Sequence, residues 1–142
     1  MLWPRWQPSS HTCAWRIRAH AAIGVWYLVK KESVELISGD TRPSERLVSA
    51  AKGVDVLVHE VYSAARLAPE KRPGGEFWPQ YMRAFHTSDI ELGRMAIRIQ
   101  PKLLILYHIV RTGRPTNEEL LAGVIAGGYK GQVVIGNDLE RY

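Results

Sequence analysis

The spacing of hydrophobic positions predicts a β-hairpin followed by a helix. Ile23 and Val25–Val29 form a β-rich apolar run, and Val34–Ile37 form a second one after a short polar stretch. Apolar residues then recur at helical spacing; Pro43 suits the first turn of that helix and Gly53 suits its carboxy-terminal cap. We therefore expect strand, strand and helix in this order.

A strand, a loop and a second helix are predicted next. The run Val54–His59 is typical of a strand, and the Pro- and Gly-rich segment 64–80 predicts a loop of the kind that often borders a site. Ser88 and Glu91 form a capping box, which predicts the start of a helix that stops before Pro101. Its apolar stripe is expected in the core and consists of Leu92, Met95, Ala96 and Ile99.

The last part of the chain repeats the alternation. Leu103–Tyr107 is typical of a buried strand, and Val133–Ile135 predicts a final strand. Between them, Thr116 and Glu119 box the start of a helix that a Gly-Gly pair closes at residues 127–128. This order of elements predicts the α/β (α+β) class with an open sheet.

Residues 1–20 do not follow these patterns. They show neither a strand period nor a helical period, and they hold Trp3, Trp6 and Trp15. A secretory signal would need a continuous apolar core of about 7–15 residues, which is missing. We therefore expect an irregular or disordered tail at 1–20 and a domain at 22–142.

Composition and length narrow the class of protein. The chain has 142 residues, 46% of them hydrophobic and 23% charged, which is typical of one globular domain. Its longest apolar run, Ala21–Val29, is far shorter than the roughly 20 residues that cross a bilayer, so no membrane span is expected. Since Cys13 is the only cysteine, no internal disulfide can form, and a cytoplasmic location is expected.

The net charge of +5 comes entirely from the first part of the chain. Residues 1–31 contain five basic residues and no acidic residue, while the rest carries 14 of each sign. A basic field broad enough to bind many phosphates is therefore absent from residues 32–142. The composition does not exclude a local basic pocket. Charge alone does not support a nucleic-acid partner.

Polar residues with catalytic chemistry follow the predicted strands. Asp40, the pair His59 and Glu60, and His108 each stand at the carboxyl end of a different strand, where sites form in open α/β sheets. His86 lies just before a helix amino terminus, which favours contact with an anion. These residues are candidates for one shared site.

Each candidate also has a purely structural interpretation when taken alone. Asp40 fits a simple turn before a helix. His59 and His108 fit buried, hydrogen-bonded histidines, and His86 simply precedes a capped helix. The His-Glu pair is not the zincin motif, because that motif needs a second histidine at the position of Ser63.

The order of four motifs favours a shared site over these structural interpretations. Ser38–Thr41, Asp55–Glu60, His86–Ser88 and Leu103–His108 together resemble the carboxy-terminal half of metallo-β-lactamase-fold hydrolases. The nearest branch contains ribonuclease Z and arylsulfatase-like enzymes. The resemblance covers about residues 22–142, and it implies an αββα sandwich of which this segment forms part: a mixed β-sheet with helices mainly on one face.

The resemblance also implies roles for four side chains. It makes Asp40 the carboxylate that bridges two zinc ions and His108 a ligand to one of them. Two ions about 3.5–4 Å apart need negative charge between them, and such a pair activates a shared water. Glu60 and His86 would then assist catalysis by contacting phosphate and protonating the leaving group. A glutamate beside an imidazole raises the pKa of the imidazolium, as a general acid requires.

The sequence departs from the family pattern in two ways. The His-Glu and His-Thr-Ser segments differ from the family's His-Glu-Ala-Thr and His-Ser-Thr motifs, which favours a general esterase or phosphodiesterase over a transfer-RNA processing enzyme. The His-x-His-x-Asp-His motif, which supplies most zinc ligands, has no counterpart, and His11 and His20 do not reproduce it. Two matched ligands predict weak zinc binding by the isolated chain.

Two hypotheses about function follow. The first is a zinc-dependent hydrolase of a small-molecule ester or phosphodiester, incomplete within this chain. The second is a non-catalytic truncated remnant or an interaction module of the same fold. Because half of a sandwich exposes an apolar sheet face, we also expect a homo-oligomer or another association through that face.

Overall fold

A six-stranded sheet forms the centre of the computed structural model, which describes residues 13–17, 25–30, 33–67, 77–111 and 113–142. The strands lie in chain order. They are β1 (Cys13–Ile17), β2 (Val25–Lys30), β3 (Ser33–Ile37), β4 (Val56–Tyr62), β5 (Leu103–Val110) and β6 (Gln132–Ile135). The first three strands pair antiparallel, whereas β3 to β6 pair parallel, so the sheet is mixed as predicted.

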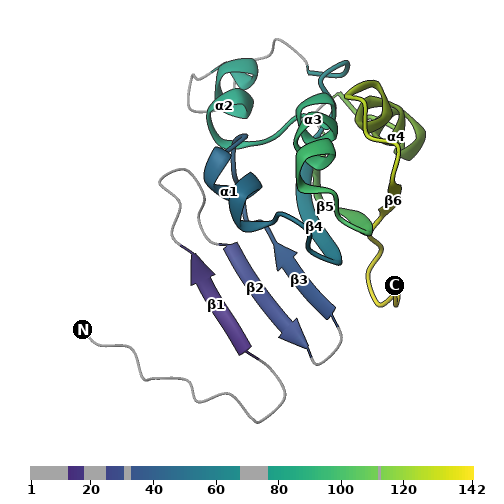
Figure 1. The fold of residues 1–142 in the computed structure, drawn as a ribbon. Helices are drawn as coiled ribbons and strands as arrows, with labels where there is room; N and C mark the ends of the chain where they lie inside the picture. The colour runs from purple at the N-terminus through teal and green to yellow at the C-terminus, as the bar shows by residue number, and fades with distance from the viewer. Residues whose placement is uncertain (1–12, 18–24, 31–32, 68–76, 112) are drawn as a thin grey trace.

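Helices connect the parallel strands. They are α1 (Glu45–Ala50), α2 (Trp78–Phe85), α3 (Asp89–Ile99) and α4 (Asn117–Ala126). Each connection steps in the same direction along the sheet, and the helices lie on one face of it (Figure 1). None of the helices in the described residues is long and apolar enough to cross a membrane.

The hydrophobic core lies between these helices and the sheet. Leu47 of α1, Leu92 of α3 and Leu120 of α4 are buried in one cluster. The sheet contributes alternate residues of its strands to the same cluster, among them Leu57 and Leu104. The prediction of a mixed sheet with helices mainly on one face is therefore confirmed.

Both predicted capping boxes are present. The Ser88 hydroxyl accepts a hydrogen bond from the Glu91 backbone N–H, and the Glu91 carboxylate accepts one from the Ser88 backbone. Thr116 and Glu119 make the same reciprocal pair at the start of α4. Local sequence therefore determines where these two helices begin.

Strand β1 differs from the prediction, because no regular element was expected within residues 1–20. Cys13–Ile17 pairs antiparallel with β2, with Cys13 opposite Val29 and Ile17 opposite Val25. An edge strand is held by backbone hydrogen bonds to its neighbour, so it forms without a hydrophobic period of its own. The rest of the expected tail, and the proposed boundary at residue 22, lie outside the described residues.

Helix α2 also differs from the prediction of a loop at 64–80. It begins at Trp78, and Pro79 stands in its first turn, where the missing N–H of proline removes no helical hydrogen bond. The proline that counted as a helix breaker therefore marks the start of a helix. This helix matters for the site, because His86 is its carboxy-terminal cap.

The sheet face opposite the helices is only partly covered. Ile37 of β3 and Val58 of β4 alternate with core residues and are half-buried, whereas Ile105 of β5 is buried outside the main core cluster. Association through it stays a prediction.

Candidate active site

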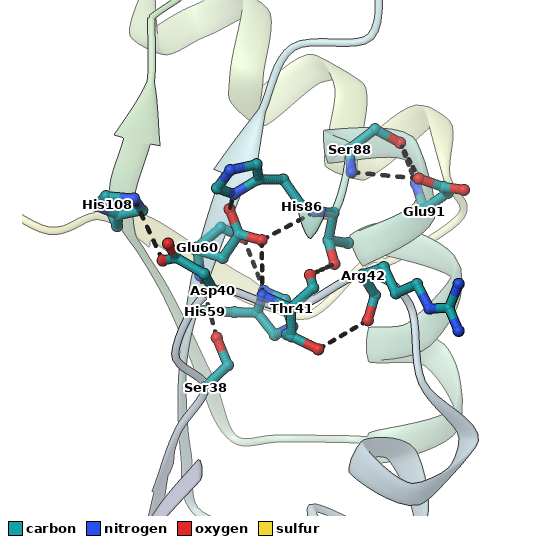
Figure 2. Close-up of polar contacts among 11 residues, drawn as sticks. Ser38, Asp40, Thr41, Arg42, His59, Glu60, His86, Ser88, Glu91 and His108 are labelled. Carbon is teal, nitrogen blue, oxygen red and sulfur yellow. Dashed lines mark hydrogen bonds and ion pairs between the residues drawn. The ribbon is translucent and has the colours of Figure 1, made fainter. Parts of the chain in front are cut away.

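The four predicted side chains lie around one edge of the sheet, at the carboxyl ends of β3, β4 and β5 (Figure 2). Asp40 follows β3, Glu60 belongs to β4, His108 belongs to β5, and His86 ends α2. Parallel strands place their carboxyl ends side by side, so residues 68 positions apart in the chain meet here. The structure thus brings together the four side chains that the sequence offered as candidates, and their roles stay a prediction.

Glu60 holds this edge together. Its carboxylate is fully buried and accepts hydrogen bonds from the backbone N–H groups of Thr41, at 3.3 Å, and Thr87, at 3.0 Å. The same carboxylate lies 2.9 Å from Nδ1 of His86. Since a buried carboxylate requires partners on both oxygens, Glu60 ties the turn after β3 to the segment between α2 and α3.

A second contact joins the same two segments. The Thr87 hydroxyl donates a 2.6 Å hydrogen bond to the backbone carbonyl of Thr41, and both residues are buried. Tyr62 continues the link, since its backbone N–H donates to the Thr87 carbonyl at 3.1 Å. The loops that carry Asp40 and His86 are thus held rigidly to the end of β4.

His108 reaches the site because of an irregularity in β5. The pairing of β4 with β5 shifts between Glu60 and Val61, so that His108 is left without a partner in the register. His108 adopts φ 41°, a left-handed conformation that side chains of this size rarely adopt. Such bulges re-aim a side chain, and Nε2 of His108 lies 3.3 Å from Oδ1 of Asp40.

Three of these side chains form a possible metal site. Asp40, His86 and His108 each offer one ligand atom, and these atoms lie within 4.8 Å of one another. Two imidazoles and one carboxylate match the protein ligands of catalytic zinc sites, which keep a further position open. His86, expected only as a catalytic residue, therefore belongs to the possible ligand set as well. The two amino-terminal histidines considered earlier, His11 and His20, lie outside the described residues.

His59 plays a structural part. It is fully buried, and its Nδ1 lies 2.7 Å from the backbone carbonyl oxygen of Glu60, to which it donates. Burial lowers the pKa of His59 and outweighs the carbonyl and the Glu60 charge, both of which raise it, so the ring is neutral. Its Nε2 has no hydrogen-bond partner among the described residues. The structural interpretation of His59 thus agrees with its surroundings.

Sequence reasoning missed Tyr107 as a member of the site. Tyr107 lies opposite Glu60 in the register, and its side chain is partly buried. Burial raises the pKa of Tyr107, as do the negative charges of Asp40 and Glu60, so the hydroxyl stays protonated at neutral pH. The signal was available: Tyr107 is a polar aromatic residue at the end of an otherwise aliphatic strand, directly before His108.

Comparison with known proteins agrees with this architecture. No protein-family model matches the chain. Ribonuclease Z from Mycobacterium tuberculosis (strain H37Rv) is 30% identical over 108 residues, which are 75% of this chain and 37% of that protein. The crystal structure of the metallo-β-lactamase-fold protein YhfI from Bacillus subtilis matches 88% of this chain with a TM-score of 0.63 and 15% identity, over 46% of its own length.

This chain has a metallo-β-lactamase fold. A further structure with this architecture, the short form of human tRNase Z, matches 72% of the chain and 38% of its own length with a TM-score of 0.51 and 18% identity. The chain spans less than half of the length of each of these relatives. The comparisons therefore support the fold expected from the four motifs, over a part of a metallo-β-lactamase-fold protein.

Proposed function

We propose that this chain carries part of a zinc-dependent hydrolase site that cleaves a phosphodiester or another ester. The observation that supports this most strongly is the placement of His86. Its ring is hydrogen-bonded to the buried Glu60 carboxylate, and it lies close to the possible metal ligands Asp40 and His108. A proton-transfer pair thus stands directly beside a possible metal site. Several curated relatives are named ribonuclease Z, which makes an RNA phosphodiester one substrate class to test.

The donor chemistry of the site fits zinc. Asp40 and His108 would hold the ion, because both side chains are partly open to solvent and their polar atoms already converge at 3.3 Å. When bound, zinc supplies Lewis acidity toward an oxygen atom at this position. Asp40 and His108 provide two ligands of one ion, and a pair of ions would need more ligands than the described residues offer.

Glu60 and His86 are proposed to handle the proton. Glu60 accepts from Nδ1–H of His86, which leaves Nε2 of the ring to face the reacting group. A carboxylate at this distance stabilises an added positive charge on the imidazole, so Nε2 can carry a proton and donate it to the leaving oxygen. Tyr107 provides a further protonated hydroxyl on the neighbouring strand.

Zinc binding and hydrolysis, measured on the same variants, separate these roles. We expect the purified chain to bind up to one zinc ion, weakly, and to hydrolyse a bis-aryl phosphodiester or an aryl ester slowly. Asp40→Asn and His108→Ala should lose both zinc and activity, while His86→Ala should keep zinc and lose activity. Asp138→Asn, which changes an exposed carboxylate elsewhere, is the control. Loss of zinc from His86→Ala would assign that residue to the metal instead.

A non-catalytic remnant or interaction module is the second candidate. It is favoured by the absence of a His-x-His-x-Asp-His motif from the sequence. Background hydrolysis of both substrates and of a short RNA, with well under one zinc per chain after dialysis, would establish it.

The proposal of a cytoplasmic protein is separate and is tested by microscopy of a tagged chain.

A further inference from the structure

Helix α2 carries a row of aromatic side chains. Trp78, Tyr81 and Phe85 share one face at helical spacing, with ring centroids 5.7 Å apart for the first pair and 4.9 Å for the second. Met82 is the only buried residue of α2, and Phe85 is 53% exposed. An amphipathic helix normally buries its apolar face, so an exposed aromatic ring at the end of this one requires an explanation.

The aromatic row is continuous with the candidate active site. The ring of Tyr81 lies 5.7 Å from the ring of His86, and the ring of His86 lies 6.2 Å from that of His108. Phe85 is the residue directly before His86. A ligand that reaches His86 therefore has Tyr81 and Phe85 beside it, on the helix that leads into the site.

The candidate active site, and not the charge of α2, indicates what kind of ligand the aromatic row suits. Arg83, the only charged residue of α2, lies two positions from both Tyr81 and Phe85, so helical spacing turns it away from the aromatic row. A phosphate ester whose phosphate contacts His86 places a ring attached to that phosphate against Tyr81 and Phe85. Stacking on aromatic side chains is tolerant of the identity of the ring, because every aromatic ring has a π-face.

We propose that Tyr81 and Phe85 form a stacking subsite for the aromatic ring of a phosphate ester whose phosphate lies at His86. The location of the subsite rests on the proposed active site, since the ring is placed next to His86. Binding to it requires no catalysis. A simple aryl ring and a nucleobase share this chemistry, and both are included in the test below.

Ligand binding to the metal-free chain tests the proposal separately from hydrolysis. Phenyl phosphate, adenosine 5′-monophosphate and methyl phosphate are titrated into protein kept in chelator, and binding is followed by NMR. We expect at least one of the two ring-bearing ligands to bind about 10-fold more tightly than methyl phosphate. The ligand that shows the larger gain identifies the source as a simple aryl group or a nucleobase.

Variants of Phe85 make the test specific. Phe85→Ala should weaken the binding of ring-bearing ligands about 5- to 10-fold and leave methyl phosphate unchanged, since removing one stacking partner has effects of this size or larger. Phe85→Leu, which keeps an apolar side chain, should show most of the same loss and guards against misfolding of the alanine variant. Ile125→Ala is the matched control, because Ile125 is a similarly exposed apolar residue on α4, at 58%.

Two results would overturn the proposal. One is that the ring adds no affinity, seen either as equal binding of the three ligands or as ring-bearing ligands whose affinity neither Phe85 variant changes. The other is concentration-dependent self-association that Phe85→Ala abolishes, which would assign this face to a second copy of the chain. If the chain fails to hydrolyse any ester but binds these ligands as expected, the proposed function fails and the subsite stands.

Discussion

Nδ1 of His86 lies 2.9 Å from Oε2 of Glu60, and both side chains are shielded from solvent. The partner on Nδ1 decides the state of the ring, because a carboxylate there accepts the Nδ1 proton and leaves Nε2 for chemistry. The other oxygen of Glu60 accepts from the backbone of Thr41 and Thr87. One buried carboxylate thus serves both the fold and the site.

Two substitutions of Glu60 should separate these contributions. Glu60→Gln keeps an oxygen for the two backbone N–H groups but turns its amide NH₂ toward Nδ1 of His86. Nδ1 must then accept, so the ring proton moves to Nε2. We expect a stability loss of about 1–2 kcal/mol and a fall in the rate of hydrolysis of about 100-fold, with zinc affinity unchanged. Glu60→Ala leaves two buried N–H groups unpaired and should cost about 3 kcal/mol or more in denaturant melts. Equal behaviour of the two variants would contradict this division of roles.

A glycine in α4 should resist replacement by alanine. A Cβ at Gly123 would lie 2.2 Å from a carboxylate oxygen of Asp89, which is buried at the start of α3 and accepts from the Ala64 backbone. Helix propensity alone predicts a gain of about 1 kcal/mol for this change, but the clash should outweigh it and destabilise the protein by about 2 kcal/mol.

The neighbouring position provides the control for that measurement. Ala122 is exposed on the same helix, so Ala122→Gly reports propensity without a clash and should cost up to about 1 kcal/mol. Thermal or denaturant unfolding of both variants measures the difference. A stabilised Gly123→Ala protein would show that α3 and α4 can separate at this point.

Stability should depend on pH through His59. Because burial lowers its pKa below the ordinary value of 6.5, the unfolded chain binds a proton that the folded chain does not. The contribution of His59 to the free energy of unfolding is therefore complete above pH 6.5 and is lost as the pH falls below it, by up to about 1.4 kcal/mol per pH unit.

A variant that does not titrate isolates this effect. His59→Asn keeps a side-chain N–H near the Glu60 carbonyl, so the free energy of unfolding should fall less steeply between pH 6.5 and pH 5 than in the unmodified protein. Denaturant melts at each pH provide the measurement. Parallel pH profiles would show that other groups account for the acid sensitivity.

The partly covered sheet face should support association. Ile37 and Val58 are half-buried apolar residues on the face away from the helices, and exposing them to water is unfavourable. We expect the chain to associate in sedimentation experiments and Ile37→Asp to shift it toward monomer. The control Ile97→Asp changes an apolar residue on the exposed side of α3 and should leave the association unchanged. A monomeric unmodified chain would remove this prediction.

The sequence by itself determined the elements whose signals are local. Both capping boxes place helix starts where the structure has them, and the apolar runs at 54–59 and 103–107 mark strands of the parallel sheet. The four site residues could be named because each follows a strand or precedes a helix, and the ends of parallel strands converge. These features depend on neighbours a few residues away, which the sequence shows directly.

Tertiary structure alone decided the contacts between distant segments. The period of residues 13–17 does not reveal β1, since its partner is the backbone of β2. Glu60 accepts hydrogen bonds from the backbone of Thr41 and Thr87, which are 19 and 27 residues away in the chain. These bonds form only when β3, β4 and the α2–α3 segment are packed together. The bulge that turns His108 toward Asp40 likewise depends on register against β4. Hydrogen bonds to buried groups are formed by whichever partner the packing brings near, so they follow from the folded chain and not from any local pattern.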